Sequence, residues 1–290
     1  FIADWHSLTT HPHPGDVTAN VRKILSEYLA CGIDPEKAAI YVQSDVKEVL
    51  ELYLYLNMNA YLGELQRVTS FKEKARKQPE NVNAGLLTYP TLMAADILIH
   101  RADKVPVGKD QEQNMEMARK FARRFNTIYG VEFFPEPQSY SFGGDAIKVP
   151  GLDGSGKMGK SEGNAIYLID DAATIRKKVM KAVTDSGPTQ PNSEKPEAIA
   201  NLFTMLKIVS SADTYDYFNE KYNACEIRYG DLKKQLAEDI VNFTSPIRER
   251  ILAYAADTEY MDKVAREGAE KARASADKTI REVRKIIGFN

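Results

Sequence analysis

Tyr89, Met93 and Asp96 follow one another at intervals of four and three residues in the segment LLTYPTLMAADIL, residues 86–98. That spacing places the three side chains on one face of a helix, in whose first turn Pro90 is expected. A thioether can lie against an aromatic ring, and a carboxylate can accept a hydrogen bond from a ring N–H. The face therefore predicts a pocket wall. Spacing alone equally fits an ordinary core stripe, because helical apolar stripes are usually core.

A second group of polar residues follows the expected strand 104–107, in the segment KVPVGKDQ. Gly108 ends this strand, and Asp110 is expected to cap the next helix, with Gln113 completing a capping box. A glycine turn between a parallel strand and a helix N-terminus is where α/β folds bind nucleotides. Asp110 or Gln111 could thus hold a ribose hydroxyl or a substrate amine. The alternative is that Asp110 only caps the helix.

The third segment is glycine-rich and runs through residues 150–164, PGLDGSGKMGKSEGN. Its glycines allow tight turns, and Lys157 and Lys160 could contact phosphate oxygens. Residues 154–161 match the P-loop pattern G-x-x-x-x-G-K-[ST]. A P-loop needs a buried strand before it and a helix beginning at its final Lys-Ser. Here a turn precedes and a coil is expected to follow, so the match is interpreted as coincidental. A solvated surface loop remains an alternative.

Histidines and cysteines give little indication of a metal site. His11 and His13 are expected in a surface turn, and His6 follows the first expected strand. The two cysteines, Cys31 and Cys225, suit a reducing cytoplasm and form no disulfide framework. No metal site is expected.

The elements that must position these residues alternate at first between strand and helix. Residues 1–4 and 39–43 are expected as strands, and apolar residues recur at helical spacing over 21–29, where Asp16 is the expected N-cap, and over 49–56. This order predicts a Rossmann-type, doubly wound parallel sheet. After about residue 170 amphipathic helices follow. We expect a catalytic domain at 1–165 and an all-helical domain at 166–290.

Composition agrees with a globular enzyme. The 290 residues are 43% hydrophobic and 28% charged, and the net charge is −2. Any contact with nucleic acid must therefore come from local basic patches. No apolar run is long enough to cross a bilayer, so no membrane association is expected.

Seven segments, in this order, resemble bacterial tryptophanyl-tRNA synthetases over nearly the whole chain: FIADWHSLTT, LACGIDPEKA, YLGELQRVTSFKEKA, NAGLLTYPTLMAADIL, VPVGKDQ, KMGKS and AVTDSG. KMGKS matches four of the five residues of the class I signature KMSKS. Tyrosyl-tRNA synthetases share the fold but typically carry glutamine where Met93 stands. The methionine suits an indole, which favours tryptophan.

The resemblance implies activation of L-tryptophan with ATP and Mg²⁺, and transfer to tRNA(Trp) by a cytoplasmic homodimer. Asp96 would accept the indole N–H, and Lys157 and Lys160 would stabilise the pyrophosphate as catalytic residues. The implied tryptophan-binding residues are His6, Tyr89, Met93, Asp96, Val105, Val107 and Gln111. The implied ATP-binding residues are Gly108, Lys109, Asp110, Val149, Lys157, Met158, Gly159, Lys160 and Ser161.

Three departures from the family pattern stand out. Gly159 replaces the usual serine of KMSKS, and Lys109 stands where an acid is expected. The family's N-terminal strand and HIGH-type phosphate-binding segment do not occur in the sequence. We therefore expect the natural protein to carry roughly 35–40 further N-terminal residues, one strand-loop-helix unit. The chain as written is expected to fold poorly or to show no tryptophan-dependent pyrophosphate exchange.

Two alternative functions remain. The P-loop match would fit an ATPase, and the missing HIGH-type segment would fit a non-catalytic RNA-binding paralogue. By resemblance, the basic C-terminal stretch from Lys263 contacts tRNA near the anticodon, although a solvated helix face would look the same. Its eight cations are Lys263, Arg266, Lys271, Arg273, Lys278, Arg281, Arg284 and Lys285.

Overall fold

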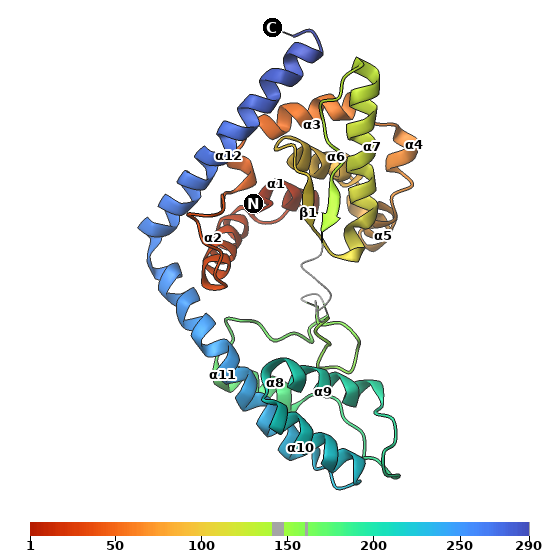
Figure 1. The fold of residues 1–290 in the computed structure, drawn as a ribbon, viewed down its shortest axis with the longest axis vertical. Helices are drawn as coiled ribbons and strands as arrows, with labels where there is room; N and C mark the ends of the chain where they lie inside the picture. Colours follow the sequence, from red (N-terminus) through yellow and green to blue (C-terminus); the bar gives the residue numbers. More distant parts are fainter. Residues whose placement is uncertain (141–147, 160–161, 290) are drawn as a thin grey trace. The chain divides into compact units, whose positions relative to one another are not determined.

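The computed structural model describes residues 1–140, 148–159 and 162–289 (Figure 1). Contacts divide the chain into two compact units, each of which is described by itself. Unit 1 comprises Phe1–Ala146 and Asp257–Asn290, and unit 2 comprises Ile147–Ala256. The expected boundary between residues 165 and 166 is therefore not the boundary between compact units.

Helices dominate both units among the described residues. Unit 1 holds α1 (Asp4–Ser7), α2 (Pro14–Ala30), α3 (Glu48–Met58), α4 (Leu62–Leu65), α5 (Thr69–Lys77), α6 (Ala84–Leu98), α7 (Glu112–Tyr129) and α12 (Thr258–Ile286). Unit 2 holds α8 (Ala172–Met180), α9 (Glu197–Val209), α10 (Ala212–Asn223) and α11 (Tyr229–Ala256). The expectation that helices take over after about residue 170 is confirmed.

Strands are short but parallel, as expected. β1 (Lys104–Pro106) pairs in parallel with β2 (Gln138–Tyr140), a strand that the sequence did not predict. The two expected N-terminal strands shrink to one parallel bridge between Ile2 and Val42. They stop there because α1 begins at Asp4 and a 3₁₀ turn begins at Gln43. The strand expectation for 1–4 and 39–43 is thus correct in pairing direction and wrong in length.

Helix α6, which carries the predicted pocket wall, packs against α3 and α7 (Figure 1). Asn83 caps it by accepting a hydrogen bond from the backbone N–H of Leu86. The helix starts at Ala84, so Pro90 lies inside it and not in its first turn. A proline there leaves one backbone carbonyl without its usual N–H partner. The expected position of Pro90 was therefore wrong.

The residues at the two ends of α2 differ in part from those expected to cap it. The N-cap is His13, whose ring accepts a hydrogen bond from Gly15, and Pro14 occupies the first helical position. Asp16, the expected N-cap, lies instead in the first turn, where a carboxylate still favours the helix dipole. After the helix, Gly32 adopts a positive φ of +95°, which glycine allows at a helix end.

Helix α12 belongs to unit 1, where its small residues enter the same core as α3, α6 and α7. Ala269, Ala272 and Ala276 are buried in that core. A Cβ on Gly268 would lie 1.9 Å from the carbonyl oxygen of Ile40, so only glycine permits this approach. The sequence had placed this helix in the C-terminal domain because helical periodicity does not show which partner an apolar face packs against.

Unit 2 has its own apolar core. Buried side chains of α8, α9, α10 and α11 form it, with Phe203 and Tyr222 at its centre. Within the described residues, no helix has both the length and the apolar character that a membrane span requires.

Candidate functional site

Asp96 is a buried carboxylate with three hydrogen bonds, and only 5% of the residue is exposed. Gln43 Nε2 donates to Oδ1 at 2.8 Å and to Oδ2 at 2.9 Å. His6 Nε2 lies 3.0 Å from Oδ2. An ionised carboxylate only accepts hydrogen bonds, so His6 Nε2 is the donor in that contact. The sequence predicted His6 and Asp96 as site residues, but it did not predict Gln43.

Tyr89 lies beside this carboxylate group. Its ring meets that of His6 edge-on with centroids 6.4 Å apart, and its hydroxyl hydrogen-bonds to Ser70 of α5. Lys74 of α5 holds its ammonium 4.2 Å from the centroid of the Tyr89 ring. Helix α5 therefore contributes two contacts to the site. Apart from the charged, amphipathic character of that segment, nothing in the sequence indicates these two contacts.

The apolar members of the predicted pocket share one cluster. Met93, Val105 and Val107 are partly buried and pack against the core of unit 1. Trp5 lies against the same core. The structure thus brings His6 into contact with both Tyr89 and Asp96. Met93 and the two valines pack against the core of unit 1.

The turn after β1 differs from the sequence expectation. Residues Lys109–Gln111 form a 3₁₀ turn, and α7 begins at Glu112 with no side-chain cap. Asp110 Oδ2 accepts from Gln111 Nε2 at 2.9 Å instead of capping. Gln113 Oε1 accepts from the backbone of Thr69 at 2.8 Å, which ties α5 to α7. The predicted capping box was therefore wrong, because these side chains have nonlocal or neighbouring partners.

Gly108 and Gln111 remain candidates for ligand contact on this geometry. Gln111 also accepts from the buried Asn114 at 2.9 Å, which fixes its amide orientation. The side chain of Lys109 lies outside the described part of the chain. In α7, Met117, Phe121 and Phe125 are buried.

In unit 2 the glycine-rich loop is held together by Asn164. This residue is 5% exposed, and its Oδ1 accepts from the backbone of Gly159 at 3.0 Å. Its Nδ2 lies 2.9 Å from Asp153 Oδ1 and 3.0 Å from the carbonyl oxygen of Lys157. The Lys157 side chain itself is exposed. Asn164 thus fixes the backbone on both sides of Met158, and the sequence did not single it out.

The other predicted ATP-binding residues of this loop include Val149 and Met158, which lie in the described part of the chain. The backbone of Met158 donates to Val149 at 3.0 Å, so these two predicted ATP contacts are neighbours. Val149 is exposed. Lys160 and Ser161 lie outside the described residues. Residues 162–171 form turns and coil, whereas a P-loop would continue into a helix from its Lys-Ser pair. The description of the loop thus supports interpreting the P-loop match as coincidental.

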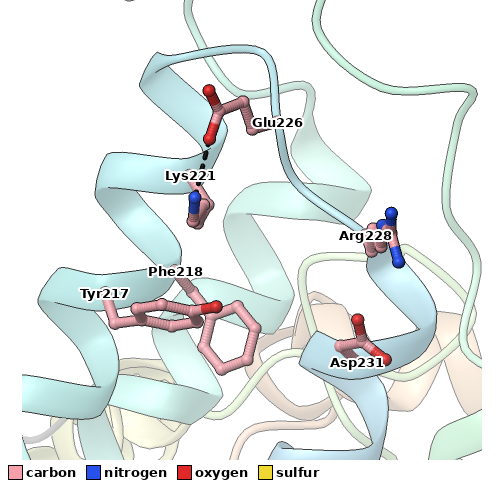
Figure 2. Close-up of a pocket in the computed structure, with 6 residues that line it drawn as sticks. All are labelled: Tyr217, Phe218, Lys221, Glu226, Arg228 and Asp231. Atoms are coloured by element: carbon pink, nitrogen blue, oxygen red, sulfur yellow. Dashed lines mark hydrogen bonds and ion pairs between the residues drawn. The ribbon is translucent and has the colours of Figure 1, made fainter.

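Unit 2 also has a pocket of about 510 Å³ between α10 and the start of α11 (Figure 2). Tyr217 and Phe218 form its aromatic side, with ring centroids 5.1 Å apart. Lys221 pairs with Glu226 at 2.6 Å, and Arg228 and Asp231 line the side formed by the start of α11. Two cations and two carboxylates balance, so the pocket lacks the positive charge that binding to phosphates needs.

No metal centre emerges from the described residues. They contain no group of three or more histidine, cysteine or acidic side chains that could hold an ion. His13 caps α2, and His11 adopts a left-handed turn at φ +49°.

Comparisons with known proteins place these features in a family. A model described as tRNA synthetases class I (W and Y) matches residues 1–245. A tryptophan–tRNA ligase of Porphyromonas gingivalis strain W83 is 78% identical over 289 residues, which cover 100% of this chain and 88% of that protein. The corresponding enzyme of Listeria monocytogenes serotype 4b is 40% identical, over 99% of this chain and 86% of its own length.

A solved structure agrees with these sequence matches. Tryptophanyl-tRNA synthetase from Campylobacter jejuni, complexed with ADP and tryptophan, matches with a TM-score of 0.88 at 33% identity. The match covers 100% of this chain and 89% of that one.

Proposed function

The chain belongs to the class I tRNA synthetases for tryptophan and tyrosine, and on that premise we propose how its residues carry out the tryptophan–tRNA ligase reaction. The protein activates L-tryptophan with ATP and transfers the product to tRNA(Trp). A carboxylate oxygen of tryptophan attacks the α-phosphorus of ATP, and pyrophosphate leaves. A ribose hydroxyl at the end of the tRNA then attacks the activated carbonyl, and AMP leaves.

The observation that carries the tryptophan assignment is the buried Asp96 carboxylate on the helix face of Met93. A buried acceptor that lacks its donor is costly, so a ring N–H has a strong advantage here over a ligand without one. Met93 provides a polarisable, apolar contact for the ring. Val105 and Val107 complete the apolar lining, and Tyr89, His6 and Gln111 contact the ligand around it.

ATP is proposed to bind through the turn after β1 and through the glycine-rich loop. Gly108, Lys109 and Asp110 contact the ribose, and Val149 contacts the adenine. Lys157 and Lys160, with the backbone of residues 158–161, stabilise charge on the departing pyrophosphate. Mg²⁺ is proposed to arrive bound to the triphosphate, where it neutralises phosphate charge while retaining most of its water ligands.

The fold proposal joins the two parallel pairings into one Rossmann-type sheet. The Ile2–Val42 bridge and the β1–β2 pair both lie in unit 1 and are both parallel. Helices α1, α3 and α7 come after Ile2, Val42 and β1 in the chain, which supports a doubly wound arrangement. Catalysis is then assigned to residues 1–165 and tRNA contact to residues 166–290, although α12 packs within unit 1.

Contact with tRNA is proposed for the cations of α12 that the packing leaves exposed. Arg284 donates to Glu51 at 2.7 Å, and Lys271 and Arg273 donate to backbone carbonyls of Pro35 and Asp45, both at 2.9 Å. These three anchor the helix. Five other cations of the same helix are exposed: Lys263, Arg266, Lys278, Arg281 and Lys285. Reversal of these charges is expected to weaken tRNA binding and to flatten its salt dependence.

Assembly as a homodimer, and work in the cytoplasm where tRNA is charged, complete the proposal. An apolar stripe on α3 supports the dimer. Leu50, Leu54 and Met58, spaced four residues apart, are 41%, 50% and 75% exposed, and Tyr61 and Leu62 extend the patch. Contiguous exposed apolar surface commonly marks an interface, and a twofold dimer buries the same patch of both copies.

Pyrophosphate exchange tests the reaction itself. The natural gene product, once purified, is expected to exchange pyrophosphate into ATP when tryptophan is present and not with tyrosine. It should release little phosphate from ATP alone. Exchange that ignores tryptophan, or ATP hydrolysis without it, would favour an ATPase. Tryptophan or tRNA binding without exchange would favour a non-catalytic paralogue.

A further inference from the structure

Gln43 is the most deeply buried polar neighbour of Asp96, with 1% of the residue exposed. It lies at the start of the 3₁₀ turn Gln43–Asp45, 53 positions before Asp96 in the chain. Its amide nitrogen donates to both oxygens of that carboxylate, at 2.8 and 2.9 Å. A buried amide with two donor contacts to one carboxylate restricts how that carboxylate can turn.

The other end of the Gln43 amide is held as well. Its Oε1 accepts from the backbone N–H of Trp5 at 3.1 Å. The backbone N–H of Gln43 donates to the carbonyl of Ile2 at 2.9 Å. If the amide were turned over, its NH₂ group would face the Trp5 N–H and its oxygen would face the carboxylate, so both contacts would become repulsive. The backbone of residues 2–5 therefore fixes which end of Gln43 meets Asp96.

This arrangement leaves Asp96 with one directed acceptor site. A carboxylate offers about four lone-pair positions, two on each oxygen. Gln43 occupies one on Oδ1 and one on Oδ2, and His6 occupies the second on Oδ2. The second position on Oδ1 remains for a ligand.

We propose that Gln43 is a positioning residue that orients Asp96 so that Oδ1 receives the indole N–H, and thereby sets the selectivity for a ring N–H donor. The proposal rests on the tryptophan pocket assigned above. Gln43 does not itself contact the substrate. It acts by holding the carboxylate that does, and its own orientation comes from the backbone of Trp5.

Two substitutions test whether the hydrogen-bond donor of Gln43 matters, and not only the volume of its side chain. Gln43→Met keeps the length and removes both hydrogen bonds to Asp96. Gln43→Glu keeps the shape but places a second carboxyl group against Asp96, which disfavours two ionised groups. The readout is pyrophosphate exchange with tryptophan and with its isostere in which sulfur replaces the indole N–H.

For Gln43→Met we expect the Michaelis constant for tryptophan to rise roughly tenfold, as when one buried hydrogen-bond partner is lost. The Michaelis constant for ATP and the kcat should change by less than about twofold, since ATP does not contact this network. The preference for tryptophan over the sulfur isostere should fall by about the same tenfold, because only tryptophan uses the oriented acceptor. Gln43→Glu should be the more damaging of the two.

Ser26→Ala is the matched control. Ser26 is also 1% exposed, and its hydroxyl donates to the carbonyl of Lys23 within α2 at 2.8 Å. Ser26→Ala should lower thermal stability as Gln43→Met does, yet leave tryptophan selectivity unchanged. If Gln43→Met raised the Michaelis constants for tryptophan and the isostere equally, Gln43 would be only a packing residue and the proposal would be overturned.

Asp96→Ala, which removes the acceptor, distinguishes this failure from a failure of the pocket. If Asp96→Ala abolishes selectivity for the ring N–H and Gln43→Met does not reduce it, only the positioning role is wrong. If Asp96→Ala leaves tryptophan selectivity unchanged, the pocket assignment fails, and the role of Gln43 fails with it.

Discussion

At the scale of single residues, the chemistry of the tryptophan pocket depends on side chains that are far apart in sequence. The helical spacing of Tyr89, Met93 and Asp96 could be predicted, because all three lie on one helix. Gln43 could not be, since it reaches Asp96 across 53 positions. Gln43 was the last residue of the expected strand 39–43. A polar residue at the end of a buried strand was the only indication that it could belong to a site.

The first prediction concerns the pocket side chains. Asp96→Ala removes the indole acceptor and leaves Gln43 and His6 without their shared partner. We expect a higher Michaelis constant for tryptophan and weaker discrimination, in a site of the kind that rejects analogues by roughly 10⁴-fold. Met93→Gln should also weaken tryptophan binding, because it places an amide in the apolar lining. Unchanged tryptophan affinity in both variants, measured by calorimetry, would refute the pocket.

The second prediction concerns the exposed cation of the glycine-rich loop. Lys157→Ala should slow adenylate formation by a factor on the order of 10² or more, since it removes a charge that stabilises the departing pyrophosphate. Tryptophan binding should change little. The same is expected of Lys160→Ala. Single-turnover measurement of adenylate formation checks this, with the exposed Lys181→Ala in α8's following turn as control. Normal rates in both loop variants would make the loop a surface turn.

At the level of elements, the sequence predicted that the C-terminal segment forms a helix, but not what this helix, α12, packs against. Its amphipathic period predicted the helix, and the structure confirms it over Thr258–Ile286. The period could not show that its small-residue face packs in unit 1, where Gly268 approaches Ile40. The capping box at Asp110 failed for a similar reason, because Gln113 has its partner on another helix.

The third prediction concerns how α12 is attached at His100. The ring of His100 bonds the Tyr41 hydroxyl at 2.9 Å and the Ser275 hydroxyl of α12 at 3.2 Å. Burial lowers the pKa of His100, so the folded protein favours the neutral ring. Because the pKa of His100 is lower in the folded protein than in the unfolded protein, the unfolded state takes up the proton first as pH falls. The stability that the neutral ring contributes is therefore lost below the unfolded value of about 6.5.

Urea unfolding at pH 7.5 and pH 5.5 tests this. The wild-type protein should lose more stability between these two values than His100→Asn, which cannot titrate. An equal loss in the two proteins would show that His100 is not responsible.

At the level of the whole molecule, the family and the reaction could be predicted, because those rest on ordered local motifs. The division into compact units could not be predicted, because it depends on packing between distant segments. The surface used for assembly could not be predicted either. The sequence did not predict that this stripe on α3 is exposed, because Leu50, Leu54 and Met58 have the same helical spacing as the residues of a buried face.

The fourth prediction tests that stripe. Leu54→Glu places a charge in the middle of the proposed interface and should convert the dimer to a monomer, because burial of an unpaired carboxylate opposes association. Glu on an exposed apolar residue elsewhere, Phe243→Glu in α11, serves as control. Sedimentation analysis would give the masses of the wild type and both variants. A wild-type monomer, or a Leu54→Glu dimer, would exclude this interface.

A crystal structure of the protein with bound tryptophan would show whether Asp96 accepts the indole N–H. The indole nitrogen is expected at hydrogen-bonding distance from Oδ1 of Asp96, about 2.7–3.2 Å. Gln43 should remain bonded to both carboxylate oxygens, with His6 on Oδ2. If tryptophan bound with its ring nitrogen turned toward another acceptor, or outside the group of Tyr89, Met93 and Asp96, Asp96 would not be the indole acceptor.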